Sequence, residues 1–149
     1  MTHAVFARAL QYDGGMSKTG FYTHPDCLLH DMGHGHPECP QRLSAIRDRL
    51  LVTGVDLALH EHEAPMAKRE DVLLAHTADL YDRVAALSRQ VQEQAIMGDP
   101  RALHLDPDTA LNEHSLNAAL RAVGAALAAT DAVLAGELSN AFCAIRPPG

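Results

Sequence analysis

The last third of the chain joins a long alanine-rich segment to a short apolar run, and this pairing leaves few folds open. Residues 113–134 have the length and the narrow side chains of a helix that packs closely on both sides. Gly136 is typical of a helix end, and residues 141–145 form an apolar run typical of a buried strand. The sequence Arg-Pro-Pro-Gly over 146–149 then predicts a tight loop at the carboxyl end of that strand.

The upstream sequence continues the alternation of strands and helices. A short strand is predicted over 20–23, a loop rich in glycine and histidine over 28–39, and a helix from Pro40 to Gly54. Further elements are predicted in this order: a strand over 56–62, a short helix over 69–76, a helix capped by Thr77, and a polar loop over 98–112. This alternation predicts an α/β fold, with a parallel sheet flanked by helices. Ligands of such sheets bind outside the carboxyl ends of the strands.

Composition excludes several classes of protein. A chain of 149 residues with 47% hydrophobic and 21% charged residues suits one globular domain or part of one. The net charge of −7, without a Lys/Arg-rich block, excludes a nucleic-acid partner. No apolar run approaches the length of a membrane span, so no membrane partner is expected. Three cysteines form no disulfide framework, which favours a cytoplasmic protein. Residues 1–18 show no clear period and are predicted to be an extension ahead of a domain over 19–149.

The loop after the first strand is dense in potential metal ligands. Taken on their own, five side chains crowded into it could form a thiolate–imidazole zinc site: Cys27, His30, His34, His36 and Cys39. Their spacing is not that of a zinc finger, because no second ligand pair follows. The alternative is a polar rim loop whose histidines bond to backbone and water. Both interpretations stay open, and the structural zinc would use Cys27, His34, His36 and Cys39.

Two motifs carry a resemblance to a known family. Gly35-His36-Pro37-Glu38, followed by Pro40-Gln41-Arg42-Leu43, and the terminal Arg-Pro-Pro-Gly resemble the class II histone deacetylases and acetylpolyamine amidohydrolases. The resemblance covers residues 19–149 and implies the N-terminal portion of an arginase/deacetylase-like parallel sheet. In family order, the catalytic His-His pair and the zinc ligands come after the position of Gly149.

The resemblance also implies roles for individual residues. His36 and Pro37 would form one wall of the active-site entrance, and Arg42 matches the family's arginine below the tunnel. Asp106, in Asp-Pro-Asp-Thr over 106–109, matches an aspartate that binds backbone amides of the acylated substrate. A carboxylate suits that task because it accepts two N–H bonds at once. On the residues alone, Asp106 and Asp108 could equally cap turns, and Arg42 could be a solvated surface residue.

The implied activity is zinc-dependent removal of acetyl groups from acetyl-lysine or acetylpolyamines. No catalytic residue and no catalytic zinc is expected within these 149 residues, so the chain alone is expected to be inactive. Because the strand over 141–145 would have an unpaired side, self-association or a further C-terminal part is expected to be needed for stability. Two alternatives remain: a non-catalytic module that binds acyl-lysine, and a small structural zinc-binding protein.

Overall fold

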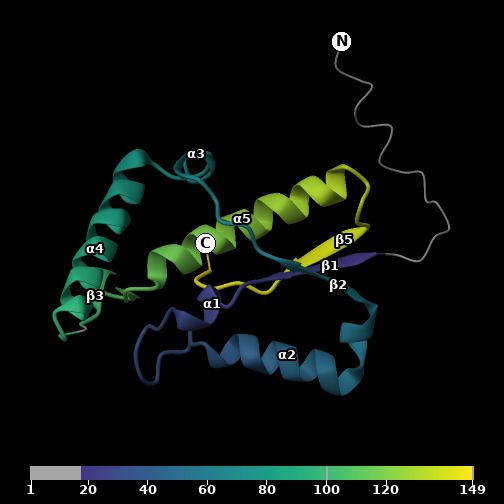
Figure 1. The fold of residues 1–149 in the computed structure, drawn as a ribbon, viewed down its shortest axis with the longest axis horizontal. Helices are drawn as coiled ribbons and strands as arrows, with labels where there is room; N and C mark the ends of the chain where they lie inside the picture. Colours follow the sequence, from purple (N-terminus) through teal and green to yellow (C-terminus); the bar gives the residue numbers. More distant parts are fainter. Residues whose placement is uncertain (1–17, 100, 149) are drawn as a thin grey trace, which may run out of the picture.

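A three-stranded parallel sheet lies at the centre of the structure, which is a computed structural model that describes residues 18–99 and 101–148. Strands β1 (Thr19–Thr23), β2 (Leu59–Glu63) and β5 (Asn140–Cys143) are arranged in the order β2-β1-β5 (Figure 1). The predicted α/β class and the parallel sheet are therefore confirmed. The predicted extension over 1–18 lies outside the described residues except for Lys18.

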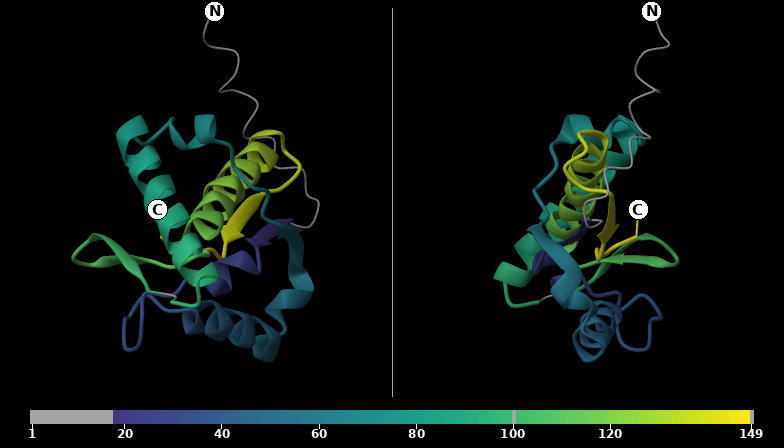
Figure 2. Two further views of the ribbon diagram at one scale, coloured as in Figure 1. Left: turned by 60° about the vertical axis from the view of Figure 1, so that its left-hand side comes forward. Right: turned by 90° about the vertical axis from the view of Figure 1, so that its right-hand side faces the viewer.

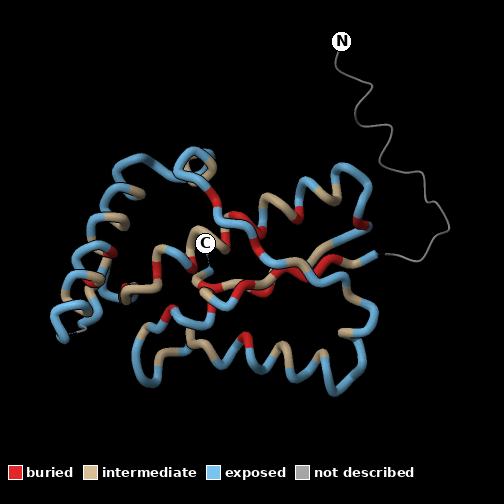
Figure 3. The backbone as a smooth tube through the Cα atoms, in the orientation of Figure 1, coloured by how far each residue is buried: buried red, intermediate tan, exposed pale blue. Residues whose placement is uncertain are grey.

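Helices cover both faces of this sheet. Helix α5 (Ser115–Leu134) lies on one face and α2 (Gln41–Thr53) on the other (Figure 1). Side chains alternate along β1, so Phe21 joins the buried cluster beneath α2 and Tyr22 joins the cluster beneath α5. Figure 3 shows the buried residues gathered along the strands and the inner side of α5.

Small residues let α5 approach its neighbours closely. A Cβ atom at Gly124 would overlap the carbonyl oxygen of Pro65, so no other residue fits without a backbone shift. Arg121 donates to the Ala64 carbonyl at 2.9 Å, which fastens the segment after β2 to the helix. Among the described residues, α5 is the one helix whose length and composition would suit a membrane span. Its small side chains pack against the sheet and this segment, as those of a core helix do.

The remaining elements are short or peripheral. They are α1 (Asp26–Leu29), the 3-10 helix η2 (Val55–Ala58), α3 (Arg69–Val72), α4 (Ala78–Ile96), β3 (Leu103–Asp106) and β4 (Thr109–Leu111). Thr77 caps α4 as predicted, because its side chain accepts a hydrogen bond from the Leu80 amide at 3.3 Å. Gly54 ends α2 in the left-handed region, with φ of 70°.

Several sequence predictions were wrong in detail. The short helix predicted over 69–76 ends at Val72. The loop predicted over 98–112 contains an antiparallel hairpin of β3 and β4. The strand predicted over 56–62 begins only at Leu59, because the left-handed Gly54 leads into a 3-10 turn. The strand predicted over 141–145 ends at Cys143, because the chain turns away there to bury the side chain of Arg146.

Candidate functional site

The candidate site lies where the carboxyl ends of the parallel strands meet three loops. One loop (residues 24–40) follows β1, another (144–148) follows β5, and the β3–β4 hairpin reaches out beside them (Figure 2). Hydrogen bonds and ion pairs join these segments, although they lie far apart in the sequence.

Arg146 is the most deeply buried charged side chain among the described residues, with 0% of its surface exposed. Its Nε and Nη2 atoms donate to the two carboxylate oxygens of Glu38, both at 2.7 Å. Nη1 donates to the backbone carbonyls of Cys27 at 3.0 Å and His30 at 2.8 Å. This bidentate pair with two further carbonyl acceptors satisfies a guanidinium that could not otherwise be buried. The segment after β5 is thereby joined to the loop after β1.

Arg42 shares the same carboxylate. Its Nη1 donates to Oε1 of Glu38 at 3.2 Å, and about half of its side chain (52%) is exposed. Glu38 thus faces two guanidinium groups, one buried and one at the surface. The structure places Arg42 in the first turn of α2, beside the candidate site and partly in solvent. Its predicted place below a tunnel stays a prediction.

His30 is buried in the same cluster and is 1% exposed. Its Nδ1 lies 2.8 Å from Oγ of Ser115, at the start of α5, while Nε2 has no hydrogen-bond partner. The nearest carboxylate oxygen to Nε2 in an ion pair is Oε2 of Glu38, at 3.6 Å. Burial lowers the pKa of His30, and this outweighs the opposite effect of the Glu38 charge. The ring is therefore neutral at pH 7.

The loop after β1 and the β3–β4 hairpin meet at His36. The backbone N–H of Glu38 donates to Nδ1 of His36 at 3.0 Å, which orients the ring. The opposite nitrogen, Nε2, lies 3.6 Å from Oδ1 of Asp108 in the hairpin turn. Pro37 is exposed beside it. The loop that carries His36 and Pro37 therefore lies against the hairpin that carries Asp106.

Asp106 is fully exposed at the tip of the hairpin. Its Oδ1 accepts a hydrogen bond from the backbone N–H of Asp108 at 2.9 Å. That hydrogen bond, with a second from the Thr109 side chain, holds the pKa of Asp106 below its ordinary value. The carboxylate therefore stays ionised and caps its own turn, as one of the two sequence interpretations predicts. Its exposure leaves the carboxylate accessible to N–H groups of a ligand.

The four residues of the structural-zinc alternative are not brought together. Over residues 18–99 and 101–148, no three His, Cys, Asp or Glu side chains form a group that could hold a metal ion. Cys27 is buried, whereas His34 is exposed in the loop. Burial raises the pKa of both the Cys27 and the Cys143 thiols, so they are protonated and poor ligands. The described residues thus do not form the structural zinc site of that alternative.

Sequence reasoning missed the centre of this site. It placed Glu38 and Arg146 only inside motifs and gave neither a role. Both are long charged side chains, which are usually solvated, so composition alone did not suggest a buried pair. The sequence did contain one signal. Arg146 stands beside two prolines at the end of a predicted strand, Glu38 stands in a predicted loop, and the two side chains carry opposite charges.

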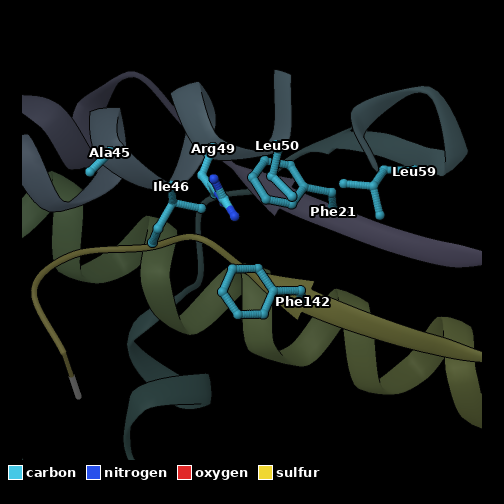
Figure 4. Close-up of a pocket in the computed structure, with 7 residues that line it drawn as sticks. All are labelled: Phe21, Ala45, Ile46, Arg49, Leu50, Leu59 and Phe142. Atoms are coloured by element: carbon cyan, nitrogen blue, oxygen red, sulfur yellow. The ribbon is translucent and has the colours of Figure 1, made fainter. Parts of the chain in front are cut away.

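An apolar groove lies apart from these polar groups, between α2 and the sheet. The groove has a volume of about 430 Å³. Figure 4 shows Phe142 of β5 facing Phe21 and Leu50 across it. Its lining residues are apolar except for Arg49. No group in the groove could perform acid–base or nucleophilic chemistry, so it is not the candidate site.

The comparisons with known proteins agree with this geometry. The family described as "Histone deacetylase domain" matches residues 36–149. A histone deacetylase-like amidohydrolase of Pseudomonas aeruginosa is 36% identical over 89% of this chain. The human polyamine deacetylase HDAC10 is 31% identical over 88% of it. Among solved structures, the HDA15 HD domain superposes with a TM-score of 0.77 and 28% identity over 89% of this chain.

The chain spans only part of these relatives. It covers 37% of the Pseudomonas aeruginosa protein, 20% of the human protein and 36% of the HDA15 chain. The family match over residues 36–149 includes residues 36–40 of the loop after β1, the hairpin and the loop after β5.

Proposed function

This chain belongs to the histone deacetylase family, and from that membership we propose that it forms the substrate entrance and scaffold of a deacetylase. The substrate class is an acetylated amine, either acetyl-lysine in a peptide or an acetylated polyamine. The observation that carries the proposal is the contact between the loop after β1 and the β3–β4 hairpin, through His36 and Asp108, together with the ion pair of Glu38 and Arg146.

Within this function, Asp106 binds the substrate backbone. Its carboxylate is exposed and ionised at the tip of the hairpin, next to the loop of His36 and Pro37. A peptide or polyamine that crosses this rim presents N–H groups, and a carboxylate accepts such donors with charge-assisted hydrogen bonds.

The chemical step requires residues other than those described here. The chemistry that zinc would supply in such an enzyme is polarisation of the acetyl carbonyl and activation of water. The residues that the structure describes contain no cluster of side chains that could bind this ion. No chemical step is therefore assigned to Cys27, His30 or His36. We expect the enzyme to work in the cytoplasm and to need a further part of the family domain.

The proposal is tested with a fused protein. It joins this chain to the part of the Pseudomonas aeruginosa relative that follows its matched stretch. We expect the fused protein to hydrolyse an acetyl-lysine peptide, and Asp106→Asn to raise KM at least about tenfold, since a hydrogen bond to a charged group contributes about 1.5–3 kcal/mol. Asp131→Asn, the same change at an exposed site on α5, is the control and should leave KM unchanged. An unchanged KM in the Asp106 variant would contradict the substrate role.

A second candidate is a module that binds acyl-lysine without cleaving it. The observation that favours it is an assembled rim beside described residues that hold no metal-binding group. Two results together would support this candidate over the first. The 149-residue chain would bind an acetyl-lysine peptide in calorimetry, and the fused protein would not hydrolyse that peptide.

A further inference from the structure

A continuous line of polar contacts runs from the rim to the segment after β5. It begins at Asp108 in the hairpin, passes to Nε2 of His36 at 3.6 Å, and continues from Nδ1 to the backbone N–H of Glu38 at 3.0 Å. The carboxylate of the same residue then holds Arg146 at two contacts of 2.7 Å. Glu38 therefore belongs to the rim through its backbone and to the strand end through its side chain.

No other carboxylate among the described residues contacts Arg146. The Glu38 side chain is 14% exposed, and its two oxygens face Arg146, Arg42 and the unpartnered Nε2 of His30. The Arg146 guanidinium in turn holds the two carbonyls of the α1 region. Because a bidentate pair fixes direction as well as distance, this contact restricts how the segment after β5 leaves the sheet.

We propose that Glu38 is a positioning residue that couples the substrate rim to the chain segment after β5. It locks residues 30–40 and residues 144–148 into one unit, so that whatever follows this segment takes a fixed place relative to the bound substrate. The proposal deepens the proposed function, and its kinetic part rests on it. Its structural part concerns only contacts within this chain.

The coupling is tested first in the complete 149-residue chain by amide hydrogen exchange. In Glu38→Gln, we expect exchange to rise at least about tenfold both in residues 30–40 and in residues 144–146, while amides of α5 keep their protection. Residues 147 and 148 are prolines and have no amide to exchange. Glu38→Asp, which keeps the charge, should restore part of the protection in both segments. Glu93→Gln, the same change at an exposed site on α4, is the control.

Two results would overturn the coupling. One is faster exchange in residues 30–40 alone, with residues 144–146 unchanged. The other is a uniform rise over the whole chain, which is the result of a purely structural loss of stability.

The kinetic part uses the fused protein. A positioning role predicts that Glu38→Gln lowers kcat at least about tenfold, with KM changed less than about twofold, and that Glu38→Asp recovers part of kcat. An unchanged kcat would overturn the positioning role. If the fused protein with native Glu38 is itself inactive, the proposed function fails, and the exchange result still decides whether Glu38 couples the two segments.

Discussion

Two buried side chains at the carboxyl edge of the sheet, Arg146 and His30, tolerate burial in opposite ways. Arg146 stays charged because Glu38 and two carbonyls surround it. His30 stays neutral because burial lowers its pKa and its Nε2 has no hydrogen-bond partner. The contribution of His30 to stability therefore depends on pH.

The pH dependence follows from the sign of the His30 shift. As the pH falls through about 6.5, the ordinary histidine pKa, the unfolded chain takes up a proton on His30. The folded chain does so only at lower pH, because its pKa is lowered. The unfolded state then binds more protons, so the free energy of unfolding falls on acidification, by at most about 1.4 kcal/mol per pH unit from this group.

Urea unfolding between pH 7.5 and 5 checks this expectation. His30→Asn keeps a polar group beside Ser115 but does not titrate, so its stability should fall less steeply with pH than that of the native chain. His104→Asn, the same change at an exposed residue of β3, is the control and should keep the native slope. Equal slopes for the native chain and the His30 variant would contradict the assignment.

At the residue scale, the local turn at an exposed polar residue could be predicted from the sequence. Asp106 could be placed in a turn because Asp-Pro-Asp-Thr has turn chemistry, and its cap to Asp108 follows from that chemistry. The role of Glu38 could not be predicted, because its partner Arg146 lies 108 positions away. Nothing local to either residue specifies that contact.

Among the elements, α5 is the helix that most limits the packing of the molecule. Its alanine-rich pattern predicted a helix packed on more than one side, and the structure shows both a sheet face and a contact with residues 64–67. The strands β3 and β4 were not predicted, because they are only four and three residues long. Such short strands do not show a clear alternation of apolar and polar residues.

Gly124→Ala tests the close approach of α5. Alanine stabilises a helix by about 1 kcal/mol relative to glycine, so helix propensity alone predicts a more stable chain. The structure predicts the opposite, because the added Cβ would overlap the Pro65 carbonyl oxygen, and overpacking costs about 1–3 kcal/mol. Thermal unfolding should show a lower Tm. Ala126→Leu, which adds volume on the exposed side of α5, should leave Tm nearly unchanged, and a raised Tm in the Gly124 variant would refute this packing.

For the whole molecule, the two edges of the sheet differ in chemistry. The β2 edge carries charged residues, with Glu61 paired to Arg47 and Glu63 paired to His24. The β5 edge is apolar, and Phe142 is 50% exposed over the groove of Figure 4. Charged edges resist the addition of further strands and apolar edges permit it. Further structure is therefore expected to pack beside β5.

Self-association of the 149-residue chain should depend on that edge. Phe142→Lys places a charge on the apolar side of β5 and should lower the average mass found by light scattering at high protein concentration. Leu57→Lys adds the same charge at a residue that is 89% exposed in η2, and should leave association unchanged. Equal association of the native chain and the Phe142 variant would show that β5 is not the contact.

The central proposal is that this chain forms the entrance and scaffold of a deacetylase, and that residues 18–99 and 101–148 hold no complete catalytic centre. The most direct measurement is hydrolysis of an acetyl-lysine peptide in the presence of zinc, with the 149-residue chain and the fused protein assayed side by side. We predict turnover by the fused protein, abolished by a zinc chelator, and none by the chain alone. Chelator-sensitive hydrolysis by the chain alone, or a folded and zinc-loaded fused protein without turnover, would contradict the account.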